Sequence, residues 1–311
     1  YFEETDNAYV QGDITYVSSR LSAQVTEVLV EDNQAVVAGD LLVRLDARDF
    51  EITLAEANAN LATRRAEHQQ AQSRLVQQDS LIAAAAANVD ASAAEQRRIE
   101  LDIRRITPLR QSGYASEEQL SNYRAQLEVA RAQVSKAQAD RQTQQLAKDT
   151  LAADIARLDA QIQVAEAAVQ QAQLDLERTE IRAPVAGRIG QRNVRIGQNV
   201  SSGSNLLAVV PDTELWIKAN FKETQISRMH EGLKAELVFD TFPDQPVTGT
   251  LQSLFPASGA QFSLLPPDNA TGNFTKVVQR IPVKLVIDED NPLAGLIRPG
   301  MSVMVKVDLR D

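Results

Sequence analysis

Residues 47–178 dominate the chain, and their middle reads DIRRITPLRQSGYASEEQL (residues 102–120). The whole stretch contains one proline, Pro108, and one glycine, Gly113, and both lie near its midpoint. On either side the residues are mainly Ala, Gln, Glu, Arg and Leu, which favour helices. The stretch therefore predicts two long helices that meet in a turn at about residues 107–116.

Mostly apolar residues recur at a seven-residue spacing along both predicted helices, as they do in coiled coils. The row in the first helix is Leu54, Leu61, His68, Leu75, Ile82, Val89, Gln96 and Ile103. The row in the second helix is Leu120, Leu127, Val134, Arg141, Lys148, Ile155, Ile162, Val169 and Leu176, with a companion row of Tyr123, Ala130, Ala137, Leu151, Leu158, Ala165 and Ala172. A stripe this narrow holds two helices together but cannot form a globular core. We therefore expect an antiparallel coiled-coil hairpin with arms of about 60 residues, or roughly 90 Å.

Composition excludes several classes of protein. The 311 residues include no cysteine, so disulfides, thiolate metal sites and cysteine nucleophiles are all excluded. The net charge of −10 argues against nucleic acid as a partner, because phosphate binding needs a basic face. No apolar run is long enough to span a bilayer.

A short pattern repeats on the two sides of the predicted hairpin. Residues 14–46 and 179–211 both show short strands with turn signals, and their apolar positions match at a constant offset of 164 residues. The matched pairs are Val17 and Ile181, Leu21 and Val185, Val25 and Ile189, Val30 and Val194, Val36 and Val200, Gly39 and Gly203, and Leu42 and Leu206. Neither copy has enough apolar surface for a core of its own. The two copies are therefore expected to pack on each other as one β domain, into which residues 47–178 are inserted.

The remaining segments predict a second β domain. Residues 1–13 contain one alternating piece that is typical of an entering strand, and residues 212–311 contain several strands with one short helix, Lys222–Gly232. This combination favours a small barrel or sandwich. Trp216 is expected in its core, and Phe255–Gly272, rich in Pro, Gly, Ser and Asn, is expected to be a long mobile loop.

Two phrases resemble a known family. The phrase IRAPVAGRI (residues 181–189), the split β module and the inserted hairpin resemble the periplasmic adaptors, or membrane fusion proteins, of the HlyD-like superfamily. The segment SGAQFSLLPPDNATGNFTKVVQRIPVKL (residues 258–285) resembles the EmrA type in particular. The resemblance implies an α+β multidomain fold in which the hairpin is inserted in a split lipoyl-like β-sandwich and is followed by a C-terminal β-barrel domain, residues 212–311.

The same resemblance implies a function without catalysis. Adaptors of this type link an inner-membrane drug transporter of the major facilitator class to a TolC-like outer-membrane channel, and several copies assemble into a ring. The chain is then expected in the periplasm, anchored to the inner membrane by a segment that precedes Tyr1. No cofactor and no metal are implied.

Three residues beside the turn are candidate contacts with the channel. Residue types alone favour ordinary roles: a solvated Arg105, a Leu109 at the end of the helix core, and a Ser116 that caps the second helix. However, the tip motif of the family is an arginine, a leucine four residues later and a serine seven residues after that. Arg105, Leu109 and Ser116 have these spacings, so the resemblance implies that they contact the channel. Pro108, which directly precedes Leu109, could bend this tip.

Other functions remain as alternatives. An adaptor of a related exporter, for type I protein secretion or aromatic acid efflux, and a purely structural coiled-coil scaffold both agree with a long hairpin. A lipoyl or biotinyl carrier is excluded, because residues 14–46 and 179–211 contain no lysine. An enzyme is not expected, because His68 and His230 lack partners at catalytic or metal-ligand spacing, and residues 288–290 (Asp-Glu-Asp) match no calcium loop.

Overall fold

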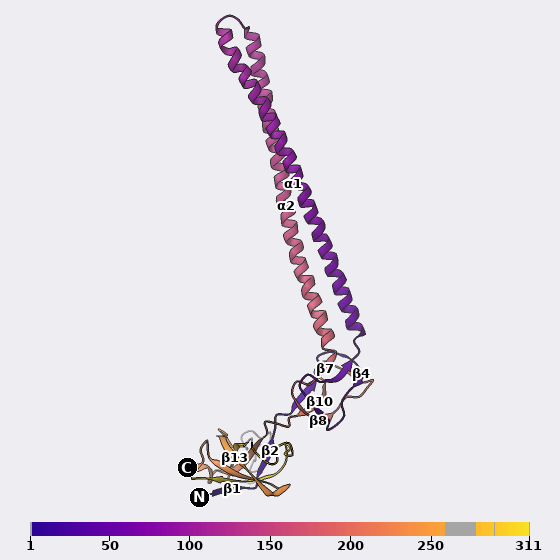
Figure 1. The fold of residues 1–311 in the computed structure, drawn as a ribbon, viewed down its shortest axis with the longest axis vertical. Coiled ribbons are helices and arrows are strands. Elements are labelled where there is room, and N and C mark those ends of the chain that lie inside the picture. Colours follow the sequence, from indigo (N-terminus) through magenta and orange to yellow (C-terminus); the bar gives the residue numbers. More distant parts are fainter. Residues whose placement is uncertain (1, 259–277, 289, 311) are drawn as a thin grey trace, which may run out of the picture. The chain divides into compact units, whose positions relative to one another are not determined.

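The computed structural model describes residues 2–258, 278–288 and 290–310. They divide into two compact units, Arg48–Leu176 and the combination of Tyr1–Ala47 with Glu177–Asp311 (Figure 1). Most of the loop expected at Phe255–Gly272 lies outside the described residues, as does most of the EmrA-like segment. No helix of the described residues is both long enough and apolar enough to cross a bilayer.

The first unit is a hairpin of two helices, α1 (Arg48–Gln111) and α2 (Glu117–Glu177). Each helix begins with acidic residues, which favour a helix N-terminus. The helices are antiparallel, because residues early in α1 pair with residues late in α2. The ion pairs Arg65–Glu166 (2.7 Å) and Asp79–Lys148 (2.7 Å) fix this register.

The helix interface follows the predicted rows. Every residue of these rows except Arg141 is fully or partly shielded from solvent. Next to exposed Arg141 the interface is polar, because buried Gln78 donates from Nε2 to the backbone oxygen (2.8 Å) and to Oε1 (2.9 Å) of Gln144. A buried amide with both bonds in place favours one helix register, since a shift would leave it unsatisfied.

In the second unit, eight strands form a sandwich of two four-stranded sheets. The sheet orders are β3-β10-β8-β5 and β7-β6-β4-β9. The strands are β3 (Thr15–Ser18), β4 (Ala23–Val28), β5 (Ala35–Val36), β6 (Leu41–Leu45), β7 (Glu180–Arg182), β8 (Gly187–Arg192), β9 (Asn199–Val200) and β10 (Asn205–Val210). Each sheet combines strands from both sides of the hairpin, so the two halves share one apolar core.

The repeat seen in the sequence is also a repeat of structure. Strands β3 to β6 recur as β7 to β10 at the same offset. The bonds between halves are reciprocal: the Gly39 N–H donates to the Ala183 oxygen and the Gly203 N–H donates to the Ser19 oxygen, each at 2.8 Å. Gly39 and Gly203 have φ angles of 93° and 87°, a conformation that favours glycine. Gly39 and Gly203 thus occupy the same position of equivalent turns, one in each half of the repeat.

Seven further strands form a barrel-like sheet in the order β1-β15-β12-β13-β14-β11-β2. They are β1 (Phe2–Thr5), β2 (Ala8–Gln11), β11 (Trp216–Lys222), β12 (Lys234–Phe239), β13 (Phe242–Leu254), β14 (Arg280–Ile287) and β15 (Val303–Asp308). The Val10 N–H donates to the Met301 oxygen (2.9 Å), and the Gly300 N–H donates to the Val10 oxygen (2.8 Å). These bonds close the sheet, and together with the hairpin and the sandwich they confirm the predicted fold class.

Three details of the predicted barrel differ from the structure. The N-terminal residues form two strands, β1 and β2, where one was expected. The expected short helix is a single 3₁₀ turn, Ile226–Arg228, although Gly232 ends this segment with φ of 96°. The placement of Trp216 in the core was wrong. Because strand residues alternate between faces, Ile217, which is fully buried, takes the core face and Trp216 faces outward.

Candidate functional site at the hairpin tip

A compact turn connects the two helices. Helix α1 continues through Pro108 to Gln111, and the Tyr114 N–H then donates to the Leu109 oxygen (2.9 Å). Gly113 adopts φ of 81°, which allows the chain to reverse after the last helical turn. Pro108 therefore lies in the last turn of the helix without ending it. Arg110 forms an ion pair with Glu117 across the turn, which ties the two helix ends together.

Ser116 caps α2. The Gln119 N–H donates to Ser116 Oγ (3.1 Å), and the Ser116 N–H donates to Gln119 Oε1 (3.3 Å). This reciprocal pair is a capping box, which satisfies two N–H groups that a helix start leaves free. Ser116 thus has the structural role that its residue type favoured. The capping geometry holds its hydroxyl at the start of α2.

Replacing Ser116 by alanine should loosen the start of α2. The loss of the cap costs about 1 kcal/mol, so the Gln119 amide should exchange with solvent about fivefold faster. Hydrogen exchange with site resolution measures this. Ser121→Ala, at an exposed position inside the same helix, is the matched control and should leave the exchange of Gln119 unchanged. Equal exchange in the Ser116→Ala protein and the unmodified protein would contradict the assigned cap.

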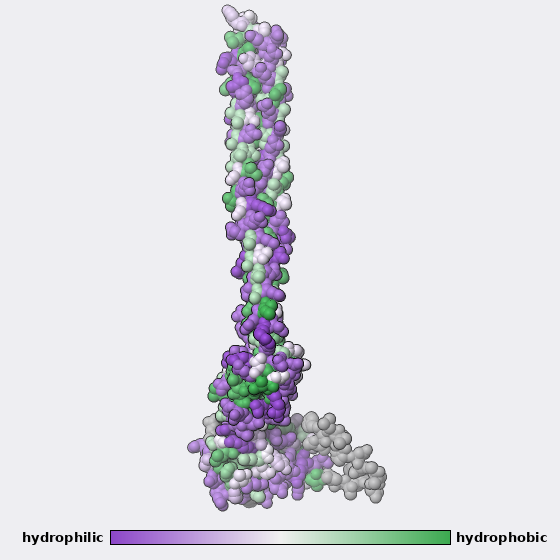
Figure 2. All heavy atoms as spheres, turned by 90° about the vertical axis from the view of Figure 1, so that its right-hand side faces the viewer, coloured by the Kyte–Doolittle hydropathy of each residue, from purple (hydrophilic) through white to green (hydrophobic). Residues whose placement is uncertain are grey.

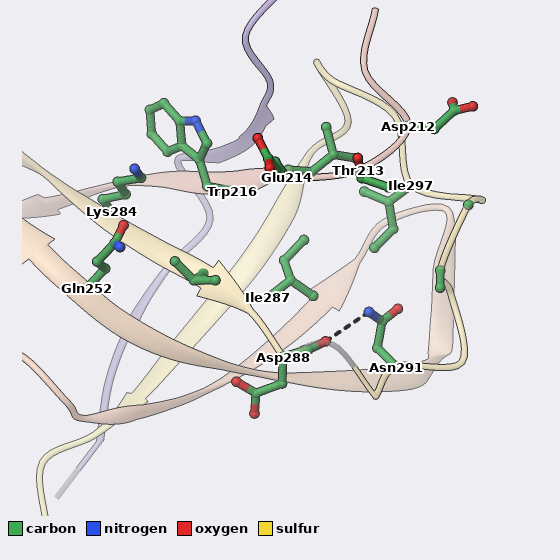
Figure 3. A pocket seen from close by; sticks show the side chains of 14 residues that line it. Asp212, Thr213, Glu214, Trp216, Gln252, Lys284, Ile287, Asp288, Asn291 and Ile297 are labelled. Atoms are coloured by element: carbon green, nitrogen blue, oxygen red, sulfur yellow. Dashed lines mark hydrogen bonds between the residues drawn. The ribbon is translucent and has the colours of Figure 1, made fainter. Parts of the chain in front are cut away.

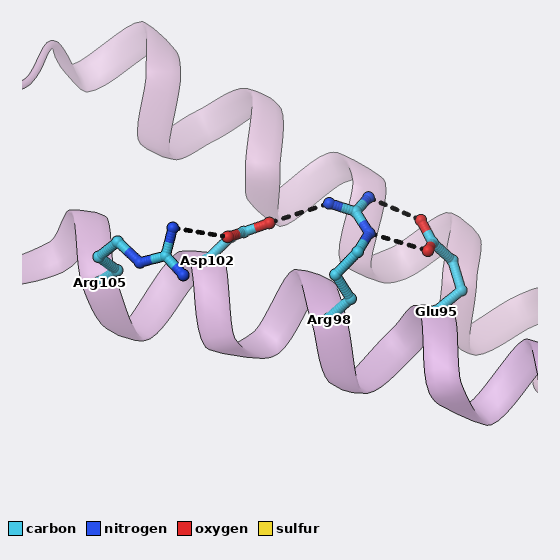
Figure 4. Close-up of polar contacts among 4 residues, drawn as sticks. All are labelled: Glu95, Arg98, Asp102 and Arg105. Carbon is cyan, nitrogen blue, oxygen red and sulfur yellow. Dashed lines mark hydrogen bonds and ion pairs between the residues drawn. The ribbon is translucent and has the colours of Figure 1, made fainter.

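Arg105 lies at the end of a ladder of charged side chains along α1 (Figure 4). Arg98 binds Glu95 through two nitrogens (2.7 and 2.9 Å) and Asp102 through a third (3.0 Å). The hydrogen bonds from Arg98 lower the pKa of Glu95. Arg105 reaches the other oxygen of Asp102 at 3.5 Å. Since this contact is the longest of the ladder and the Arg105 side chain is 76% exposed, its guanidinium remains available to a partner.

Apolar side chains are exposed beside this arginine. Leu109 keeps 44% of its surface in solvent, and Tyr114 keeps 85%. The sequence offered Leu109 either as the end of the helix core or as a contact with the channel, whereas Tyr114 was not singled out. Its signal was an aromatic residue between Gly113, which turns the chain, and Ser116, which caps the next helix. The tip thus presents a cation and two apolar groups close together along the chain.

The other candidate residues have structural partners. His68 lies in the helix interface with Nε2 at 3.0 Å from Asp159 Oδ1, so it joins the two helices. Within residues 2–258, 278–288 and 290–310, no group of three or more His, Asp and Glu side chains could hold a metal ion. Burial alone would raise the pKa of Asp288, but hydrogen bonds from Thr248, Lys234 and Thr250 outweigh burial and lower it. Asp288, which directly follows β14, is therefore present as a charged carboxylate.

A pocket of about 600 Å³ lies on the barrel (Figure 3). Its walls come from the segment before β11, from β11, β13 and β14, and from the segment after β14. The lining residues are Asp212, Thr213, Glu214, Leu215, Trp216, Gln252, Lys284, Val286, Ile287, Asp288, Asn291, Ala294, Gly295 and Ile297. It contains the outward-facing Trp216, which the sequence had placed in the core.

These features define a class of protein. A split β-sandwich that carries an inserted helical hairpin, together with a β-barrel domain, is the architecture of membrane fusion adaptors. Residues 13–212 match the family model described as "RND MFP, barrel-sandwich hybrid domain". The chain belongs to this family of adaptor proteins, which are not enzymes, and within the family it is of the EmrA type.

Known relatives cover the whole chain. It is 40% identical over 310 residues to "Colistin resistance protein EmrA" of Acinetobacter baumannii, covering 100% of this chain and 88% of that protein. It is 35% identical over 312 residues to "Multidrug export protein EmrA" of Escherichia coli (strain K12), covering 99% of this chain and 77% of that protein. The crystal structure of MacA from Actinobacillus actinomycetemcomitans superposes with a TM-score of 0.57 over 98% of this chain and 80% of that one, at 19% identity, which shows a shared fold.

Proposed function

We propose that this protein is a periplasmic adaptor that links an inner-membrane transporter of the major facilitator class to a TolC-like outer-membrane channel, for the export of drugs or other toxic compounds. The observation that carries the proposal is the hairpin tip, where Arg105 and Leu109 are exposed at the turn between two long helices. The names of relatives that confer colistin resistance and export several drugs support an export role.

The chemistry of the tip suits a groove between channel helices. A guanidinium can make forked hydrogen bonds to carboxylates or backbone oxygens, and a leucine can fill an apolar groove. In this proposal Arg105 exchanges its long contact with Asp102 for an acceptor on the channel, while Leu109 and Tyr114 bury their exposed surface. Ser116 contributes by fixing the turn, and its hydroxyl lies at the surface beside the same partner.

Self-association into a ring is part of the proposal. Several large apolar side chains of the hairpin point away from the helix interface and are exposed. They are Ile52, Val76, Leu81, Leu101, Val129, Leu146, Val164 and Leu174. Hydrophobic residues are accordingly scattered over the visible hairpin surface between hydrophilic ones (Figure 2). Lateral contact with further copies would bury these side chains, so the hairpin surface is compatible with the proposed ring.

Anchoring at the inner membrane by an N-terminal segment completes this proposal. The alternative is an adaptor of an exporter for type I protein secretion or for aromatic acid efflux, and the names of the relatives favour drug export over both. A structural scaffold is less favoured, since it gives no reason for an exposed cation and exposed apolar groups at the turn.

Site-specific crosslinking tests the proposed contact. Because the chain contains no cysteine, Leu109→Cys introduces a single thiol at the tip. In cells that carry the partner channel, a short thiol-to-amine crosslinker should join this protein to the channel. The control is Val129→Cys, an equally simple change at a position of α2 that is 59% exposed. Crosslinks to the channel from Val129→Cys but none from Leu109→Cys would refute docking through the tip.

A further inference from the structure

Two lysines oppose each other on the outer face of the barrel. Ile217 and Ala219 of β11 are fully buried, so Trp216 and Lys218 point outward. Lys218 is the direct cross-strand partner of Lys284 on β14. Like charges at such a position repel each other, which lowers stability. Lys218 and Lys284 lower stability by this repulsion and add nothing to the core. Because a bound anion would offset the repulsion, the pair points to a negatively charged ligand.

Each of these lysines covers an aromatic ring and no carboxylate. Lys284 Nζ lies 5.1 Å from the centre of the Trp216 ring, and Lys218 Nζ lies 5.6 Å from the centre of the Phe255 ring. In the part of the chain that the structure describes, neither ammonium forms an ion pair with a carboxylate. Two cations that lack a carboxylate partner among the described residues, beside partly exposed aromatic rings, attract an anion that carries an apolar group.

The pocket next to Lys284 provides room for such a ligand. Its volume of about 600 Å³ suits a small organic molecule. Leu215, Ile287 and Ile297 supply apolar walls, and Trp216 and Lys284 lie side by side on neighbouring strands (Figure 3). Lys284 lines the pocket, whereas its cross-strand partner Lys218 lies outside the lining. An aromatic ring can therefore lie in the pocket while its charged group stays at Lys284.

The carboxylates of the pocket are mostly neutralised. Asp212 forms ion pairs with Arg188 (3.3 Å) and Arg298 (3.5 Å), and Asp288 forms one with Lys234 (3.3 Å). Glu214 is the remaining lining carboxylate, and among the described residues it has no ion-pair partner. Its side chain is exposed, so water screens its charge. The unpaired lysines therefore favour an anion, and Glu214 opposes it.

We propose that this pocket binds small aromatic carboxylates, with the carboxylate at Lys284, the neighbouring charge of Lys218 favouring the anion, and the ring against Trp216 and the apolar wall. The site lies on the barrel and is independent of the hairpin tip, so it does not rest on the proposed docking to a channel. It gives the adaptor a ligand site of its own. Organic acids that carry an apolar ring are its expected class of ligand.

The fluorescence of Trp216 tests the proposal, because it is the only tryptophan of the chain. Three probes of nearly equal size carry the same quenching nitrophenyl ring: 4-nitrobenzoate is an anion, 4-nitrobenzamide is neutral and 4-nitrobenzylammonium is a cation. The anion should quench Trp216 saturably and bind about tenfold more tightly than the amide, the size of one charge-assisted contact. Equal or tighter binding of the amide or the cation, or quenching that never saturates, would overturn the proposal.

Four variants locate the binding. Lys284→Met should weaken 4-nitrobenzoate binding about tenfold, whereas Lys284→Arg, which keeps the charge, should retain it. Glu214→Gln should strengthen it, because it removes the opposing charge. Lys306→Met is the matched control, since Lys306 covers the Phe2 ring at 4.8 Å and lies outside the pocket lining. An unchanged affinity in Lys284→Met, or an equal loss in Lys306→Met, would show that the anion is not held at Lys284.

Discussion

Bacteria that depend on this protein should lose drug resistance when Arg105 and Leu109 are both replaced by aspartate. The double variant puts two carboxylates where the proposed contact with the channel needs a cation and an apolar group. The expected cost in channel binding is about 2 kcal/mol or more, which is about 30-fold in affinity. Export should then fall to the level of a strain without the adaptor, as measured by growth in drug.

The same variant should remain folded. Both side chains are exposed, and surface changes usually alter the free energy of unfolding by about 0.5 kcal/mol. The melting temperature and binding to the transporter should therefore be retained. The control is Ala132→Asp with Arg131→Asp, which makes the same change of charge at two exposed positions of α2 that lie away from the tip and outside the side chains proposed for lateral contact. Full resistance in stably expressed Arg105→Asp/Leu109→Asp cells would leave the adaptor without a contact site at its tip.

Replacing residues 52–174 by a short glycine-rich turn should leave a folded β protein that has lost nearly all its helical circular dichroism. Helices α1 and α2 have 64 and 61 residues and account for almost all the helix of the described chain. Neither β core contains a residue of this range. Strands β6 and β7 remain paired, since the Leu45 N–H donates to the Thr179 oxygen (2.9 Å), and this pairing needs no long connection.

A cooperative melting transition and a soluble β spectrum would support this independence. The purified full-length protein is the reference for both measurements. If the shortened protein is unfolded or aggregates, the hairpin contributes to the stability of the sandwich, and the division into separate units fails. Replacing a long insertion by a short turn lowers the entropy of the unfolded chain, so the shortened β protein should not melt below the full-length protein.

The sequence predicted those parts of the fold in which one repeating pattern controls packing. Heptad rows predicted the helix interface, because a helix presents every seventh residue to the same side. Gln78 and Gln144 were not singled out, because hydrophobicity alone does not mark a polar pair inside an interface. The two hydrogen bonds that Gln78 donates to Gln144, which make burial tolerable, depend on the register of two helices and are visible only in the structure.

Trp216 shows why strand faces were harder to predict. Leu215, Trp216 and Ile217 are all apolar, so the alternation of apolar and polar residues that distinguishes the two faces of a strand is missing there. The sequence therefore does not predict which of them faces the core. In the structure Ile217 is buried in the core, and Trp216 lines a pocket together with Lys284. Cross-strand pairs such as Lys218 and Lys284 join residues far apart in the sequence, and their register cannot be read from either strand alone.

The insertion of the hairpin also sets the order in which the parts can fold during synthesis. Strand β6 leaves the ribosome more than a hundred residues before its partner β7, a delay of roughly ten seconds. During this time the apolar side chains of Leu42, Val43 and Leu45 have no second half to cover them. The hairpin needs only contacts within itself, so we expect it to form first. We expect the sandwich to remain open, and prone to aggregation, until residues beyond Val210 have emerged.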